Sequence, residues 1–123
     1  MKALTIKQPW ASLIRENIKK IEFRSWKTNY RGVIYIHAGS SIEKNELPRF
    51  SILNLEYPTS RIIAKATLVD CIEITPEVNE HIKSLNNIAY GNKDRTGYAW
   101  ILDNIEPIDD KKEIKGKLGL WNL

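Results

Sequence analysis

The chain has 123 residues, of which 42% are hydrophobic and 28% charged, and it carries a net charge of +4. This composition is ordinary for one soluble globular domain and excludes a disordered chain, while a basic excess of this size permits a polyanionic partner without requiring one. No apolar run approaches the roughly 18 residues of a membrane-spanning helix, so we expect a cytoplasmic protein with no membrane contact.

The N-terminal part of the chain predicts a strand, a helix and a second strand. Residues 3–6 form a short apolar strand that ends at Gln8, and Pro9 suits the first turn of a helix over residues 10–16. Asn17 follows as a left-handed stop. Residues 20–26 then alternate in polarity, which predicts a half-buried strand. One face of it carries Ile21 and Phe23, and the other carries Lys20, Glu22, Arg24 and Trp26.

The middle of the chain predicts a central strand over residues 33–38 and a helix over residues 42–55, which Pro48 weakens. His37 closes the apolar strand and is expected to be a structural histidine. A long strand follows over residues 61–74 and contains Cys71, the only cysteine, which excludes an internal disulfide. One cysteine and two distant histidines offer no zinc-ligand set, so we expect no metal and no cofactor.

The C-terminal part begins with Thr75 as a helix N-cap and Pro76 at the first helical position, ahead of a helix over residues 77–85. A loop over residues 86–97, a strand over 98–105 and a last strand over 115–123 complete the chain. Strands outnumber the short, interspersed helices. The pattern predicts an α+β protein, in which helices pack around a small, partly closed β-barrel.

The charged strand has two interpretations. On periodicity alone, Lys20, Glu22 and Arg24 more often form a solvated edge, where each exposed ion pair contributes under about 1 kcal/mol. The alternative is a binding face, in which Arg24 holds a phosphate, Glu22 meets a base edge and Trp26 stacks on a base. An exposed tryptophan beside an arginine favours the second interpretation. Lys19 lies off this alternation, at the mouth of the strand.

Five other side chains are candidates for the same surface. Gln8 and Trp10 are expected in a pocket wall, although a turn with Trp10 in the core is at least as frequent. Lys93 and Arg95, in a glycine-flanked loop, suit phosphate contact or plain solvation. Tyr98 offers a ring for base stacking, although core packing is the commoner role of such a residue.

Several separated blocks resemble the ASCH family, the activating-signal-cointegrator homology domains related to the PUA fold. These blocks are residues 3–11, 19–26, 28–32, 36–39, 97–102 and 115–121. The family signature G-x-K-x-x-E-x-R is met by Lys19, Glu22 and Arg24, with Asn17 in place of its glycine. Asparagine is the next best residue for left-handed backbone, so the turn is expected to survive.

The resemblance covers nearly the whole chain. It implies a single ASCH / PUA-like domain over residues 1–123, built as a mixed β-barrel of five to six strands with a cleft beside the signature strand. Family members bind RNA or DNA there, which implies RNA, single-stranded or carrying a modified nucleotide, as the first expected partner, with DNA as a possible one. A role as a protein-interaction module rests on family analogy alone.

One branch of the family hydrolyses N(4)-acetylcytidine, which makes a small amidohydrolase the alternative function. That branch matches this chain at Lys19 but has threonine where this chain has Glu22. Independently, the neighbouring Lys20 and partial desolvation favour a neutral Lys19 amine, which activates water with help from Glu22. A charged Lys19 that contacts phosphate is the more frequent role.

Overall fold

The computed structural model describes residues 1–123. Its elements, in chain order, are β1 (Lys2–Gln8), α1 (Trp10–Arg15), β2 (Ile21–Arg24), β3 (Gly32–Ile42), the 3-10 helix η1 (Lys44–Leu53), β4 (Arg61–Glu73), α2 (Pro76–Ser84), β5 (Tyr98–Pro107) and β6 (Leu120–Asn122). The strands form one six-stranded sheet in the order β2-β5-β4-β3-β1-β6. The β1–β3 pair is parallel and the other pairs are antiparallel. The predicted α+β class is confirmed.

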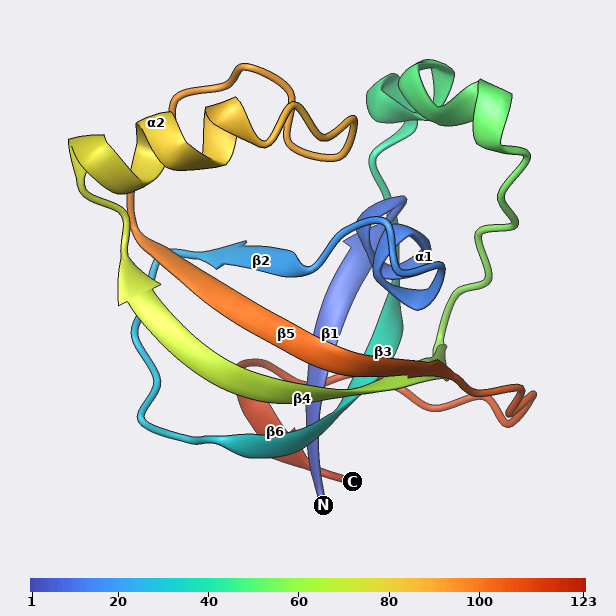
Figure 1. The fold of residues 1–123 in the computed structure, drawn as a ribbon. Coiled ribbons are helices and arrows are strands. Elements are labelled where there is room, and N and C mark those ends of the chain that lie inside the picture. The colour runs from blue at the N-terminus through green and yellow to red at the C-terminus, as the bar shows by residue number, and fades with distance from the viewer.

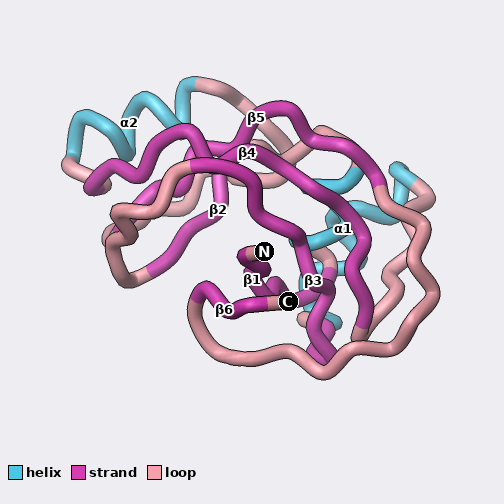
Figure 2. The backbone as a smooth tube through the Cα atoms, turned by 90° about the horizontal axis from the view of Figure 1, so that it is seen from below, coloured by secondary structure: helices cyan, strands magenta, loops and turns pink.

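The sheet curls into an open arc, and η1 and α2 lie at one end of it (Figures 1 and 2). The hydrogen-bonded order leaves β2 and β6 as its two edges, so the predicted barrel is not closed. The physical reason is the shortness of these edges: β2 has 4 residues and pairs only with β5, and β6 has 3 and pairs only with β1. Short edge strands offer little backbone for further pairing.

Two predicted elements differ from the structure. The helix expected over residues 42–55 is a 3-10 helix, and the strand before it runs on through Gly39, Ser40 and Ser41. The strand continues because Ile42 still pairs with Gln8 of β1 beyond a register shift. The last strand, expected over residues 115–123, is confined to β6. The other elements, including the Thr75 cap that accepts from the Val78 N–H, follow the predicted pattern.

Two apolar clusters make up the core. One lies within the curved sheet and includes Leu4, Ile36 and Trp100. The other joins α1 to η1, α2 and the segment before β5, and includes Phe50 and Tyr90. This second cluster supports the end of the sheet where β2 begins. None of the helices combines the length and the apolar character needed to cross a bilayer.

The predicted left-handed residue is found at Asn17, with φ of 63°. The turn lets the N–H groups of Ile18 and Lys19 both donate to Leu13 O at 3.0 Å, which directs the chain from α1 into β2. An Asn17→Val substitution is expected to lower the free energy of unfolding by about 1–2 kcal/mol, because a β-branched side chain disfavours positive φ. Asn17→Gly is the matched control and should be close to neutral. Urea denaturation measures both, and equal losses would contradict the explanation.

Candidate functional site

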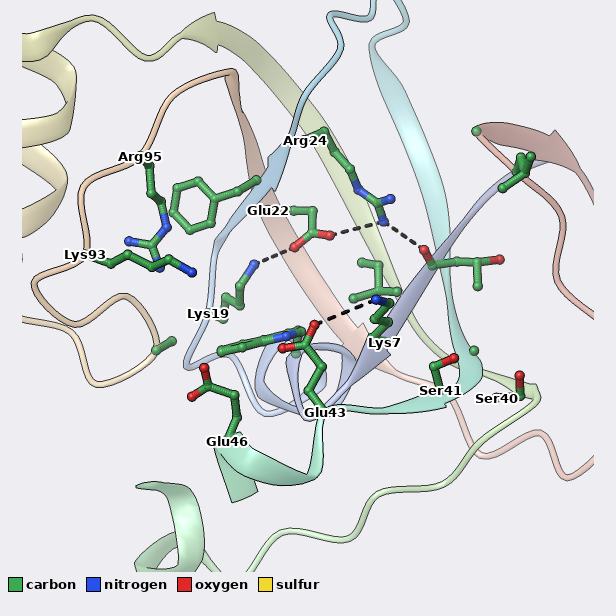
Figure 3. A pocket seen from close by; sticks show the side chains of 18 of the residues that line it. Lys7, Lys19, Glu22, Arg24, Ser40, Ser41, Glu43, Glu46, Lys93 and Arg95 are labelled. Carbon is green, nitrogen blue, oxygen red and sulfur yellow. Dashed lines mark hydrogen bonds and ion pairs between the residues drawn. The ribbon is translucent and has the colours of Figure 1, made fainter. Parts of the chain in front are cut away.

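A pocket of about 510 Å³ opens beside β2. Its walls come from β1, β2, the end of β3, η1, the loop before β5 and the segment before β6. Basic side chains outnumber acidic ones in its lining: three acidic residues (Glu22, Glu43 and Glu46) stand against seven basic ones, namely Lys7, Lys19, Arg24, Arg49, Lys93, Arg95 and Lys117. In Figure 3, Lys93 and Arg95 lie on one side of the pocket, Ser40 and Ser41 on the other, and Lys19 and Glu22 between them.

The base of the pocket is a chain of three charges. Lys19 Nζ donates to Glu22 Oε1 at 2.6 Å and to Ile21 O at 2.5 Å. Arg24 Nη2 lies 3.1 Å from Glu22 Oε2 and donates to Thr5 O at 2.7 Å. Lys19 and Glu22 are 2% and 7% exposed. Glu22 and Arg24 therefore share a face that looks into a pocket rather than forming a solvated edge, and Lys19 joins them from outside the alternation.

Burial and neighbouring charges act on Lys19 in opposite directions. Desolvation lowers its pKa most, and the nearby Arg24 and Arg95 lower the pKa further. Glu22 raises the pKa through its charge and its hydrogen bond, but the net pKa stays below the ordinary value of 10.5. Lys19 thus releases its proton more readily than an exposed lysine does.

Tyr90 fixes the backbone where β2 begins. Its buried hydroxyl accepts the N–H groups of Lys20 and Ile21 at 3.0 and 3.1 Å. Its ring also packs edge-on against Phe23, with the two centroids 5.7 Å apart. Burial raises the pKa of the Tyr90 phenol, so the hydroxyl stays protonated at neutral pH. One side chain therefore sets the position from which Lys19 and Glu22 project.

A Tyr90→Phe substitution is expected to lower the free energy of unfolding by about 1–3 kcal/mol, because two backbone N–H groups lose their acceptor. Tyr30→Phe is the matched control, since the exposed Tyr30 hydroxyl makes one hydrogen bond, to Val33 O. That control should stay within about 0.5 kcal/mol of the wild type. Urea denaturation compares the two, and a Tyr90→Phe variant as stable as Tyr30→Phe would contradict this role.

Arg95 leaves the pocket with an unbalanced positive charge. Its guanidinium lies 4.1 Å from the centroid of the Phe23 ring, and its pKa is lowered by burial and by the nearby Arg49. No carboxylate pairs with it, whereas Arg49 is paired with Glu46 at 3.0 Å. Two buried N–H groups, on Arg95 Nη1 and Arg24 Nε, have no acceptor. Both side chains line the pocket, and an anionic ligand bound there would balance the unpaired charge of Arg95.

Six of the nine predicted site residues line this pocket: Trp10, Lys19, Glu22, Arg24, Lys93 and Arg95. The other three do not. The Gln8 amide is buried and used internally, donating to Pro58 O at 2.8 Å and accepting from Ser12 N at 2.9 Å. Trp26 packs edge-on against Trp100 with centroids 4.7 Å apart, and Tyr98 packs against the sheet core.

Several lining residues were missed by sequence reasoning. The alternation of the strand placed Phe23 on the face opposite Glu22. In the structure Phe23 also lines the pocket, where its ring lies against the Arg95 guanidinium. Lys7 and Arg49 come from segments whose pattern indicated only a strand and a helix. Leu118 gave no local signal, because the sequence predicted a strand over residues 115–123, in which an apolar residue is ordinary. The structure confines the strand to Leu120–Asn122 and leaves Leu118 outside it.

Comparison with known proteins identifies the family to which the chain belongs. The family model for the ASCH domain matches residues 4–112. Over 132 aligned residues the chain is 28% identical to the human and the mouse proteins named Activating signal cointegrator 1. The alignment covers 98% of this chain and 22% of each of those proteins, so the chain spans about a fifth of the length of these curated relatives. Since the family model matches most of its length, this chain belongs to the ASCH domain family.

Proposed function

We propose that this ASCH domain binds RNA, as a single strand or through a modified nucleotide, in the pocket beside β2. The observation that carries the proposal is the unpaired Arg95 at the edge of a pocket with seven basic and three acidic side chains. Phosphate is an anion that guanidinium groups hold well. The volume of about 510 Å³ is that of a small-molecule site, which suits one nucleotide turned out of a strand and not a duplex.

The lining residues divide into two expected roles. Lys93 and Arg95 meet phosphate, and Arg24 extends this contact from the base of the pocket, where Thr5 O and Glu22 hold its guanidinium. Trp10 provides the aromatic surface for a base. The sequence predicted that role for Trp26 and Tyr98, which do not line the pocket, and placed Trp10 only in a pocket wall. Family membership supports the same assignment, because the resemblance to ASCH domains implied nucleic-acid binding.

The direct test is fluorescence anisotropy with short labelled oligonucleotides of one sequence, prepared as single-stranded RNA, single-stranded DNA and duplex RNA. We expect the single-stranded RNA to bind most tightly, with log K falling linearly as log salt concentration rises. Affinity that does not change with salt, or a preference for the duplex, would count against the proposal.

A second candidate function is hydrolysis of N(4)-acetylcytidine, favoured by the Lys19–Glu22 contact of 2.6 Å and the lowered pKa of Lys19. A neutral Lys19 amine would take a proton from water. The resulting hydroxide would attack the acetyl carbonyl, and the C–N bond would break as the cytosine nitrogen takes the proton back, which releases cytidine and acetate.

Incubation of the purified protein with N(4)-acetylcytidine tests this candidate. We expect turnover to rise with pH below 10.5, as the buried Lys19 loses its proton. Lys19→Met is the control, because it keeps the length of the side chain without the amine. Turnover no greater than that of this control would exclude the substrate, without bearing on RNA binding.

A further inference from the structure

Leu118 is the most exposed large hydrophobic residue of the chain, at 98%, and it lines the basic pocket. A single exposed leucine is unremarkable elsewhere on a protein surface. Here it projects at the lip of a pocket whose other lining is mostly charged, and Lys117 stands directly before it. The position therefore offers an apolar contact and a positive charge side by side.

The backbone on both sides of Leu118 is held in place. Before it, Gly116 lies so close to the sheet that a Cβ there would be 2.6 Å from Thr5 Oγ1 and 2.9 Å from His37 Cε1. The His37 ring, buried as expected for a structural histidine, lies with Nε2 2.6 Å from Ile114 O. These contacts tether the segment that leads to Leu118.

The segment after Leu118 is anchored as well. Gly119 turns the chain with φ of 66°, and Leu120 then pairs with Leu4 of β1. Trp121 Nε1 donates to Thr5 Oγ1 at 3.0 Å. A backbone that is already fixed at both ends loses little further freedom when a ligand contacts the side chain that it carries. The position of Leu118 at the mouth of the pocket is thus fixed before a ligand binds.

We infer that Leu118 packs against a nucleobase of the bound strand, next to the nucleotide that enters the pocket. The inference rests on the proposed function. A ligand that uses both the cations and Leu118 must alternate anionic and apolar groups, as phosphates and bases do in a single strand. Leucine side chains are among those that pack between bases, and contact with a base face is tolerant of sequence.

The test compares Leu118→Ser with the wild type in anisotropy titrations against a labelled single-stranded RNA. We expect binding about fivefold weaker, from the loss of roughly half of a buried leucine contact. The slope of log K against log salt should not change, whereas Lys117→Gln should make that slope less steep by about 0.7. Ile52→Ser is the matched control, because Ile52 is 82% exposed and does not line the pocket. It should bind like the wild type.

A second measurement identifies the base as the partner. A series of RNAs, each with one abasic position, should include one that weakens wild-type binding and leaves the Leu118→Ser variant unaffected. If the wild type binds RNA and the Leu118→Ser variant binds it with the same affinity, the inference is wrong and the proposed function stands. Equal losses for Leu118→Ser and Ile52→Ser would overturn the inference too. Failure of the wild type to bind any RNA would remove both.

Discussion

Replacing Glu22 by glutamine is expected to lower the free energy of unfolding by about 3–5 kcal/mol, because it leaves the Lys19 ammonium buried without its counter-charge. Lys19 is 2% exposed, and Glu22 is its only carboxylate partner, at 2.6 Å. A neutral amide keeps the shape and one acceptor but removes the attraction that offsets desolvation. Urea denaturation at neutral pH measures the loss. A change below about 1 kcal/mol would show that Lys19 escapes into the pocket or loses its proton readily.

The matched control adds Lys19→Met to the same variant. The double variant no longer buries an unpaired ammonium, and Arg24 still donates to Thr5 O, so most of the lost stability should return. A double variant as unstable as Glu22→Gln alone would mean that the amide disturbs packing, and that burial of charge is not the cause.

The pH dependence of the Glu22→Gln variant gives a separate prediction. The pKa of Lys19 is already below 10.5 in the folded wild type, and the loss of Glu22 removes the contribution that raises it. Between the folded pKa and the unfolded value near 10.5, the unfolded chain binds more protons, so stability rises with pH in that interval. We expect the destabilisation by Glu22→Gln to shrink as urea titrations move from neutral pH toward about 10.5. A constant difference would contradict the assignment to Lys19.

The second large expected effect concerns binding. A Lys93→Gln/Arg95→Gln variant should bind single-stranded RNA about tenfold more weakly at physiological salt, with a salt slope less steep by about 1.4, because two phosphate contacts are lost. Anisotropy titrations over a range of salt concentrations give both quantities. Arg95 packs on Phe23, so a urea titration of the same variant checks that the fold is intact.

The control for this variant is Lys111→Gln/Lys112→Gln, which removes the same charge from two exposed lysines outside the pocket. Only the long-range part of the attraction should fall, so affinity should drop by less than about twofold. Equal losses in the two variants would show that net charge drives binding and that the pocket does not.

Local features of the sequence predicted the turn before β2, the N-cap of α2 and the alternation of side chains along β2. The left-handed turn at Asn17 and the cap at Thr75 follow from backbone and hydrogen-bonding preferences of single residues, and both are found. Alternation placed Glu22 and Arg24 on one face. Periodicity alone favoured a solvated edge for that face, because alternating charges occur more often on a solvent-exposed strand than at the base of a pocket.

Lys19, Glu22 and Arg24 were selected as site residues by the match of the sequence to the ASCH signature, since periodicity did not favour them. Only the tertiary structure decided that they form one buried chain of charges, that Gln8, Trp26 and Tyr98 pack elsewhere, and that the sheet stays open between β2 and β6. It also brought Arg49 and Leu118 to the same pocket. The physical reason is range: propensity and periodicity act within a few residues, whereas the pocket is assembled from segments more than a hundred residues apart.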